Sequence, residues 1–334
     1  MNYKKKIYLL TGIIAVFAIT YVLTIIFDPE NMQARSDAYT WLDPSDIDKI
    51  TGITITAPVN TENDEDVKPV ALSKNDGLWF VLNEGRDYPA RQLRVEDFIA
   101  LLSKRDQYPV RSSSASSHER LSLEEHSAVK VTIAAGAGKP VLQMLIGQSD
   151  QSGSNVFMRK IDQNEVRLGT DNFSSYVNSS LSAWYELRLF PENQSWKNDD
   201  VQRISVYPPA EQDIDGQIEQ IEPMIFTRNG KAWDFNFDLE NPDSGKVEEF
   251  IRTILETNAN DFTNLGASDS SINYCSLELE FANGTKIRIR IGPPDENENY
   301  FAAVSGTNWV YVLPGWAYSR LFPEKQFFEK PPGE

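Results

Sequence analysis

The alternation of apolar and polar residues in this chain predicts antiparallel strands joined by short turns. In residues 129–133 and 277–281 every second residue is apolar, which is typical of a strand that buries one face. Residues 129–168 as a whole predict a meander of four short strands. Short glycine-containing sequences separate such runs and predict hairpin turns, at residues 75–77, 136–138, 229–230 and 283–284.

The last of these hairpins has a predicted pairing. Residues 286–291 are expected to form its second strand, with three isoleucines facing inward. Arg288 and Arg290 are then expected to face the glutamates of the preceding strand, because directly opposed residues of antiparallel strands share a face of the sheet.

Two segments have a helical spacing of apolar residues instead. Residues 94–105 and 247–256 each place apolar side chains three and four positions apart. Runs of antiparallel strands with one inserted helix predict an α+β fold made mainly of β-meanders, because a doubly wound sheet would need strands and helices in alternation.

The same succession of patterns occurs twice, and the separation between matching blocks only decreases along the chain. The blocks are residues 46–51 with 200–205, 72–75 with 226–229, Trp79 with Trp233, residues 95–99 with 247–251, Gly147 with Gly292, and Val166 with Val310. This pattern is typical of duplicated domains in which one copy has lost loop residues. The sequence therefore predicts a tandem duplication.

The longest match joins residues 184–192, WYELRLFPE, with residues 316–324, WAYSRLFPE. It pairs Trp184 with Trp316 and Arg188 with Arg320. We interpret the paired tryptophans as core anchors, because a duplicated core must be filled twice, whereas a platform for sugars or peptides need not be doubled. Each arginine is expected to pair with a carboxylate or to end a helix, with binding of an acidic partner as the alternative.

Residues 7–27 contain no charge, follow three lysines and precede Asp28 and Glu30. As a helix they would span about 32 Å, close to a hydrocarbon core of about 30 Å. Lysines before the segment place the N-terminus in the cytoplasm. We expect an uncleaved single-pass anchor in the cytoplasmic (inner) membrane, contacting lipid through residues 7–27, with most of the chain extracytoplasmic or periplasmic. The alternative is a cleaved signal peptide, whose apolar region is usually shorter.

The expected domain organisation follows from the anchor and the repeats. It consists of a cytoplasmic stub (1–6), the anchor (7–27), a tether (28–45), the first α+β repeat (46–192), the second (193–328) and a tail (329–334). The acidic run at 62–66 is expected to be a solvated loop, and the serine-rich segment 111–117 a second loop.

Charge and cysteine content restrict the partners. The net charge is −17, with 49 acidic and 32 basic residues, so the soluble part is expected to repel nucleic acid and anionic lipid headgroups. Cys275 is the single cysteine, which excludes an internal disulfide. Because it is in phase with the apolar residues of 277–281, it is expected to be buried.

No catalytic, cofactor or metal site is predicted. His118 and His126 could be metal ligands or a base for a nearby serine, but no carboxylate or cysteine cluster accompanies them at ligand spacing, so an exposed pair in a loop is favoured. Residues 136–139 lack the spacing of a phosphate loop. Residues 295–299 lack that of a calcium loop, and an acidic hairpin tip is expected.

The order of these motifs resembles a bacterial family known as a domain of unknown function, number 4340. The features that carry the resemblance are Trp79, the helix with Val95 and Phe98, Ile146-Gly147, the strand at 156–159 and Arg188, with counterparts at Trp233, Phe250, Ile291-Gly292 and Arg320. It would cover residues 41–328, and it departs from the family at 120–123, where a Tyr-Gly-Leu-like turn is usual. The resemblance implies a membrane-anchored accessory protein beside an ABC transporter of the gliding-motility type, with no catalytic residues to carry over.

The leading functional hypothesis is therefore a non-enzymatic scaffold or accessory subunit that contacts an ABC-type permease. The first alternative is a module that binds envelope glycan or peptide in a cleft between the two repeats. The second is an enzyme that uses a serine with His118 or His126. The sequence does not identify a small-molecule ligand.

Overall fold

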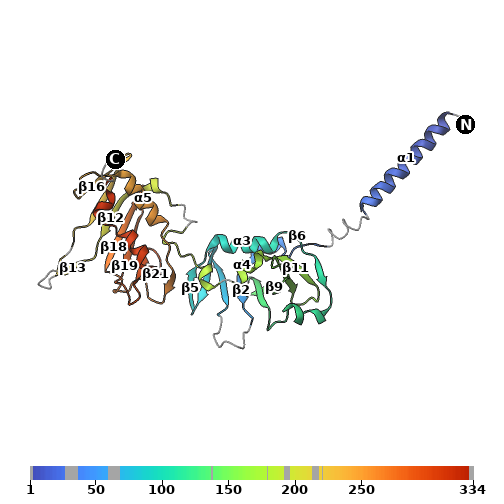
Figure 1. The fold of residues 1–334 in the computed structure, drawn as a ribbon, viewed down its shortest axis with the longest axis horizontal. Coiled ribbons are helices and arrows are strands. Elements are labelled where there is room, and N and C mark those ends of the chain that lie inside the picture. The colour runs from blue at the N-terminus through green and yellow to red at the C-terminus, as the bar shows by residue number, and fades with distance from the viewer. Residues whose placement is uncertain are drawn as a thin grey trace. The chain divides into compact units, whose positions relative to one another are not determined.

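The computed structural model describes residues 3–26, 37–58, 68–136, 138–178, 180–191, 196–212, 218–219 and 221–330. The chain divides into two compact units, Met1–Gly85 with Leu93–Ala183 and Arg86–Gln92 with Trp184–Glu334. The division therefore falls at Ala183/Trp184, whereas the sequence placed it at 192/193. Mostly antiparallel sheets with a few helices make up the fold, so the α+β prediction is confirmed (Figure 1).

The first sheet has nine strands in the order β5-β4-β3-β2-β8-β9-β10-β11-β7. Its strands are β2 (Ile50–Thr56), β3 (Val70–Asn75), β4 (Leu78–Asn83), β5 (Arg86–Pro89), β7 (Val110–Ser112), β8 (Val129–Ala135), β9 (Lys139–Ser149), β10 (Asn155–Lys160) and β11 (Val166–Thr170). The predicted four-strand meander is β8 to β11. Other elements are β1 (Ala38–Tyr39), paired with β6 (Asp106–Gln107), the helices α3 (Gln92–Ser103) and α4 (Ser174–Val177), and the short 3-10 helices η1 (Pro44–Lys49), η2 (Ala115–Ser117), η3 (Glu119–Leu121), η4 (Asp171–Phe173) and η5 (Leu181–Trp184).

The second sheet has eight strands in the order β16-β15-β12-β18-β19-β20-β21-β17. Its strands are β12 (Val201–Tyr207), β15 (Met224–Asn229), β16 (Ala232–Phe235), β17 (Asp261–Thr263), β18 (Cys275–Phe281), β19 (Lys286–Ile291), β20 (Asn299–Val304) and β21 (Val310–Pro314). Other elements are β13 (Glu211–Gln212), paired with β14 (Ile218–Glu219), the helices α5 (Ser244–Leu255) and α6 (Gly315–Leu321), and the 3-10 helices η7 (Asn198–Asp200) and η8 (Lys325–Phe328).

From β4 onward in the first sheet and from β16 onward in the second, the strands follow one another in the same order along the chain. The irregularity of the central strand also recurs, since the register shifts after Ile50 in β2 and after Val201 in β12. Ile50 therefore occupies the position of Val201, whereas the sequence aligned it with Ile204. The matched blocks at 46–51 and 200–205 are thus out of structural register.

The predicted hairpins at 75–77, 229–230 and 283–284 are confirmed. At the turn between β3 and β4, Asp76 and Gly77 have φ angles of 50° and 84°, the two consecutive positive values that a type I′ turn needs. The turn at 136–138 joins β8 to β9, with residue 137 outside the described residues.

Between β18 and β19 the predicted charge pairing is half right. Arg288 lies 2.9 Å from the carboxylate of Glu278. Arg290 does not face a glutamate, because the register places it opposite Ser276. Its guanidinium donates to the backbone carbonyls of Ile272 and Ala267 instead.

Each predicted helix has one buried face. Those residues are Val95, Phe98, Ile99 and Leu102 in α3, and Val247, Phe250, Ile251, Ile254 and Leu255 in α5. Asp243 caps α5 by accepting a hydrogen bond from the amide of Gly245, which satisfies a donor at the helix N-terminus. Both helices begin two or three residues before the predicted segments, as expected for boundaries that capping geometry decides.

Two segments predicted to be irregular belong to the first unit. Residues 37–45 were expected to form a tether, yet Trp41 and Leu42 are buried. Trp41 packs edge-on against Tyr39 and Tyr108 at 5.1 and 5.6 Å between ring centroids. The serine-rich segment 111–117 was expected to be a loop, but it contributes to β7 and forms η2.

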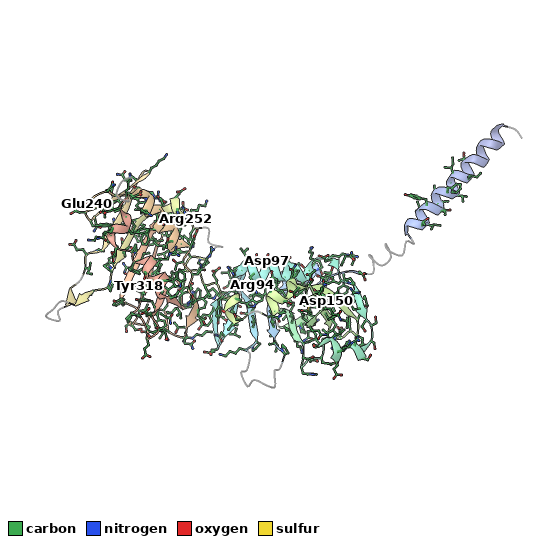
Figure 2. The ribbon with its side chains drawn as sticks, in the orientation of Figure 1. Arg94, Asp97, Asp150, Glu240, Arg252 and Tyr318 are labelled. Atoms are coloured by element: carbon green, nitrogen blue, oxygen red, sulfur yellow. The ribbon has the colours of Figure 1, made fainter. Side chains whose placement is uncertain are left out.

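At the N-terminus, α1 comprises Tyr3–Ile26, with side chains described for residues 11–24 (Figure 2). Counted over the residues that the structure describes, no helix is long and apolar enough to cross a membrane. Residues 1–2 of the predicted stub, 28–36 of the predicted tether, the acidic run at 62–66 and residues 331–334 of the predicted tail lie outside the described residues.

Candidate functional site

The four tryptophans that recur between the two halves of the sequence form one pair with similar surroundings and one pair with different surroundings. Trp79 and Trp233 are both buried, in β4 and β16, and each lies beneath a cationic side chain of the neighbouring strand. Lys74 lies over Trp79 at 5.7 Å, and Arg228 lies over Trp233 at 4.5 Å. This pair has the structural role that the sequence predicted.

Trp184 and Trp316 do not form such a pair. Trp184 is fully buried at the end of η5, whereas Trp316 is 58% exposed near the start of α6. The buried aromatic that ends η8 in the second unit is Phe328, which packs on Phe226 and Phe250 at 4.6 and 5.4 Å between centroids. The prediction that Trp316 anchors the second core is therefore wrong, because Phe328 fills that place.

The two arginines that recur between the halves also differ. Arg188 forms an isolated backbone bridge with Asn258, and the following Leu189 and Phe190 are buried in the second unit. Arg320 is exposed in the last turn of α6, where a cation interacts favourably with the helix dipole. The interpretation as a helix-end residue therefore holds for Arg320.

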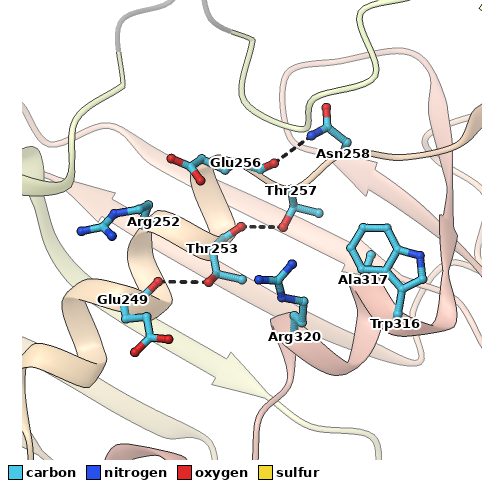
Figure 3. Close-up of a pocket in the computed structure, with 9 residues that line it drawn as sticks. All are labelled: Glu249, Arg252, Thr253, Glu256, Thr257, Asn258, Trp316, Ala317 and Arg320. Carbon is cyan, nitrogen blue, oxygen red and sulfur yellow. Dashed lines mark hydrogen bonds between the residues drawn. The ribbon is translucent and has the colours of Figure 1, made fainter.

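Arg320 and Trp316 line a pocket between α5 and α6, which we call the Trp316 pocket (Figure 3). Its volume is about 340 Å³, and all of its walls belong to the second unit. The lining residues are Glu249, Arg252, Thr253, Glu256, Thr257, Asn258, Trp316, Ala317 and Arg320.

Most polar groups of this pocket are already engaged. Glu249 pairs with Lys246 at 2.9 Å. The hydroxyls of Thr253 and Thr257 donate to backbone carbonyls of α5 at 3.0 and 2.6 Å, and the side-chain amide of Asn258 donates to the carbonyl of Glu256 at 3.0 Å.

The guanidinium groups of Arg252 and Arg320 differ from these groups. Neither makes a hydrogen bond or ion pair with any residue in the described part of the chain. The same holds for the carboxylate of Glu256, so the pocket offers two cationic groups, one carboxylate and an open indole face to a ligand.

At the equivalent place of the first unit, aromatic side chains pack against α3. There Tyr176 follows β11 at the same distance along the chain as Arg320 follows β21. Its ring stacks on Phe98 of α3 at 5.0 Å, and the guanidinium of Arg94 lies 4.9 Å from the ring centroid (Figure 2 labels Arg94). Aromatic packing thus fills in one unit the place that is open in the other.

The family model described as Domain of unknown function (DUF4340) matches residues 79–274, which is more than half of the 334 residues. The chain belongs to the DUF4340 family. The match is narrower than the predicted range of 41–328, and it includes Trp79, Gly147, Arg188 and Trp233 but ends before α6. The description names no activity. No curated protein and no solved structure matches the chain.

The histidines of this DUF4340 protein are not the exposed pair that was predicted. His118 is buried, only 4% exposed, and its Nε2 lies 3.1 Å from the carbonyl oxygen of Asn164, to which it can donate. His126 is exposed. Within the described ranges, no group of three or more His, Cys, Asp or Glu side chains is arranged to hold a metal ion.

The segment 295–299 forms the turn that leads into β20, as predicted for an acidic tip. The carboxylate of Asp295 accepts hydrogen bonds from the amides of Asn297 and Asn299 at 2.8 and 2.9 Å. These bonds stabilise the charged form and lower the pKa of Asp295.

Cys275 is buried as predicted, and burial raises the pKa of its thiol to about 12. Because the thiolate is the reactive form, we expect the native protein at pH 8 to resist a maleimide reagent for hours. Labelling should become complete within minutes in denaturant, as mass spectrometry can measure. Rapid labelling of the native protein would contradict this account of a structural, unreactive cysteine.

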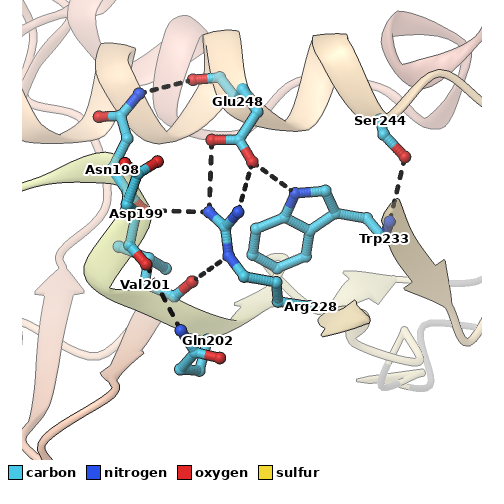
Figure 4. A network of polar contacts seen from close by, with 8 residues as sticks. All are labelled: Asn198, Asp199, Val201, Gln202, Arg228, Trp233, Ser244 and Glu248. Carbon is cyan, nitrogen blue, oxygen red and sulfur yellow. Dashed lines mark hydrogen bonds and ion pairs between the residues drawn. The ribbon is translucent and has the colours of Figure 1, made fainter. Parts of the chain in front are cut away.

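A polar network in the DUF4340 protein joins β15, β16 and α5 to the start of β12 (Figure 4). Arg228 lies 2.9 Å from the carboxylate of Glu248 and donates to the carbonyls of Val201 and Asn198 at 2.7 and 3.0 Å. The indole N–H of Trp233 donates to the same carboxylate at 2.9 Å. The guanidinium group, the carboxylate and the indole N–H all have partners within the unit. We therefore assign this network a role in stabilising the fold, not in binding a ligand.

Proposed function

We propose that this DUF4340 protein is a non-enzymatic, single-pass membrane protein whose extracytoplasmic region serves as an accessory or scaffold subunit of an ABC-type transport complex. The observation that carries binding over chemistry is the Trp316 pocket. Its free groups are guanidinium groups, a carboxylate and an indole ring, which recognise partners, whereas Cys275 is buried and His118 is bonded to the backbone.

The tandem duplication is part of this proposal. It is supported by the shared strand order of the two sheets and by the matching irregularities after Ile50 and Val201. Matching irregularities are a strong sign because bulges tend to persist within families. With two copies of the same fold, an accessory protein could carry a pocket on one copy and use the other copy for different contacts.

The membrane anchor is supported by the sequence of residues 7–27 and by the helical structure of Tyr3–Ile26. The side chains described in this helix include Phe17, Val16 and Ile19, all more than half exposed to solvent. Apolar side chains in such number need an apolar surrounding, and a bilayer would provide one.

The accessory role rests on the resemblance of the sequence to proteins beside ABC transporters of the gliding-motility type. The protein would not be the transport ATPase itself. The part of its sequence that comes closest to a phosphate-binding loop lies at the hairpin turn between β8 and β9. We expect the soluble units to contact the permease, which their attachment to the same membrane would favour.

Crosslinking in the native membrane, followed by purification of the full chain and mass spectrometry, tests this role. We expect recovery of a permease and its ATPase in near-stoichiometric amounts. The matched control retains residues 1–36 and carries an unrelated soluble domain in place of residues 37–334, and it should recover neither protein. Recovery of the full chain alone, or equal recovery by both chains, would count decisively against the accessory role.

A second candidate function is binding of an envelope glycan or peptide. The observation that favours it is the exposure of Trp316, since an indole ring open to solvent is the group that such ligands stack on. The candidate site is then the Trp316 pocket within the second unit.

A further inference from the structure

We propose that the Trp316 pocket binds an acidic saccharide, with one sugar ring stacked on the indole of Trp316 and a carboxylate held by the guanidinium of Arg320. The inference deepens the ligand-binding candidate and does not depend on a transport partner. It assigns a ligand class to one face of the second unit, between α5 and α6.

The first argument is the exposed indole. Trp316 is 58% exposed, although the core of the same unit buries aromatic residues of similar size. Its neighbour Ala317 is buried and fixes α6 on the unit without help from the indole. The ring face is therefore not needed for folding, and the C–H groups of a sugar ring are a suitable partner for an aromatic face that is otherwise in water.

The second argument is the unpaired cations. In the second unit, Arg228 and Arg288 each pair with a carboxylate. Arg252 and Arg320 have none among the described residues. The fork of a guanidinium group matches a carboxylate with two parallel hydrogen bonds, so either arginine can bind the carboxylate of a ligand in this way.

The third argument is the remaining wall. Glu256 and Asn258 also line the pocket, and Figure 3 shows the carboxylate of Glu256 on the side of Arg252. The carboxylate of Glu256 is exposed and pairs with no described residue, so it can accept hydrogen bonds from sugar hydroxyls. A volume of about 340 Å³ lies near the lower end for ligand pockets, which suits one or two sugar rings rather than a long chain.

The last argument is the comparison between the two units. In the first unit the equivalent place is filled by Tyr176, packed on Phe98. A feature that the shared fold requires would be expected in both units. Among the described residues, the second unit has an open pocket and an exposed indole at this place, as expected for a site that binds a ligand.

Isothermal titration of the full chain in lipid nanodiscs with a disaccharide of galacturonic acid tests the proposal. We expect measurable binding that weakens at least tenfold in Trp316→Ala and in Arg320→Gln. The uncharged galactose disaccharide should bind at least tenfold more weakly than the acidic one. Arg203→Gln, an exposed arginine of β12 outside the pocket, is the matched control and should bind like the unchanged protein.

Three outcomes would overturn the proposal. They are no binding of the acidic disaccharide, equal binding of both disaccharides, and equal displacement by inorganic phosphate, which would indicate a site for any anion. Because Trp316 and Arg320 are exposed, both variants should keep the thermal unfolding midpoint, so lost binding would not reflect lost folding. Co-purification of a permease is measured separately, so the two proposals can fail independently.

Discussion

Replacing Gly147 by alanine is expected to lower the free energy of unfolding of the first unit by about 3 kcal/mol, the upper part of the usual range for overpacking. A Cβ atom at Gly147 would lie 2.3 Å from the carbonyl oxygen of Leu121 and 2.8 Å from that of Ser122. Both contacts are with backbone atoms, which cannot rotate away. Hydrogen exchange followed by mass spectrometry would detect the loss as faster exchange in β8 and β9, separately from the second unit.

Two other glycines provide the controls for this substitution. At Gly136 a Cβ would meet nothing within 4 Å, so Gly136→Ala should change stability by less than about 0.5 kcal/mol. At Gly292 the nearest atom is the carbonyl oxygen of Ser271 at 3.1 Å, and a smaller effect is expected in the second unit. Similar exchange rates in the alanine variants of Gly147 and Gly136 would refute the argument from close approach.

The sequence predicted those parts of the fold that depend on neighbouring residues. Hairpins follow from turn residues that tolerate positive φ, as Asp76 and Gly77 do. The two helices follow from apolar spacing, and the buried faces of α3 and α5 confirm it. The sequence identified Gly147 and Gly292 only as a recurring pair. In the structure, both lie where backbone carbonyl oxygens of an earlier segment leave little room for a Cβ atom.

The sequence misassigned those parts that depend on where a segment lies in the sheet. The shared letters of 184–192 and 316–324 paired Trp184 with Trp316, but one ends η5 and the other lies near the start of α6. Two segments of similar sequence can therefore belong to different elements of the fold. His118 was expected in an exposed loop because no carboxylate or cysteine cluster accompanies it in the sequence, but it is buried and lies 3.1 Å from the carbonyl oxygen of the distant Asn164.

The candidate site could not be predicted for the same reason. Arg252 and Arg320 are far apart in sequence, and only the packing of α6 beside α5 places both around one pocket. No spacing rule marks such a pair. The sequence did contain one indication of the site: the second unit has Arg320 at the place where the first unit has an aromatic residue, Tyr176. It becomes readable only once the strands have been aligned by structure.

Replacing Glu248 by alanine is expected to destabilise the second unit by about 3 kcal/mol, since removing one partner of a largely buried ion pair leaves the other uncompensated. The side chain of Arg228 is only 13% exposed and would lose its carboxylate. The indole N–H of Trp233 would lose its acceptor at the same time. Urea denaturation, with hydrogen exchange in β15, β16 and α5 as the local measure, would give the size of the effect.

The matched control is Glu278→Ala in the same unit, which removes the partner of Arg288. That arginine is 46% exposed, so water can replace the lost carboxylate, and the expected cost is below about 1 kcal/mol. A cost for Glu248→Ala no larger than that for Glu278→Ala would mean that the network around Arg228 adds little to folding. A large difference would instead explain why this arginine, unlike Arg320, is unsuited to hold a ligand: most of its N–H donors are already used to join β15 to α5 and to the start of β12.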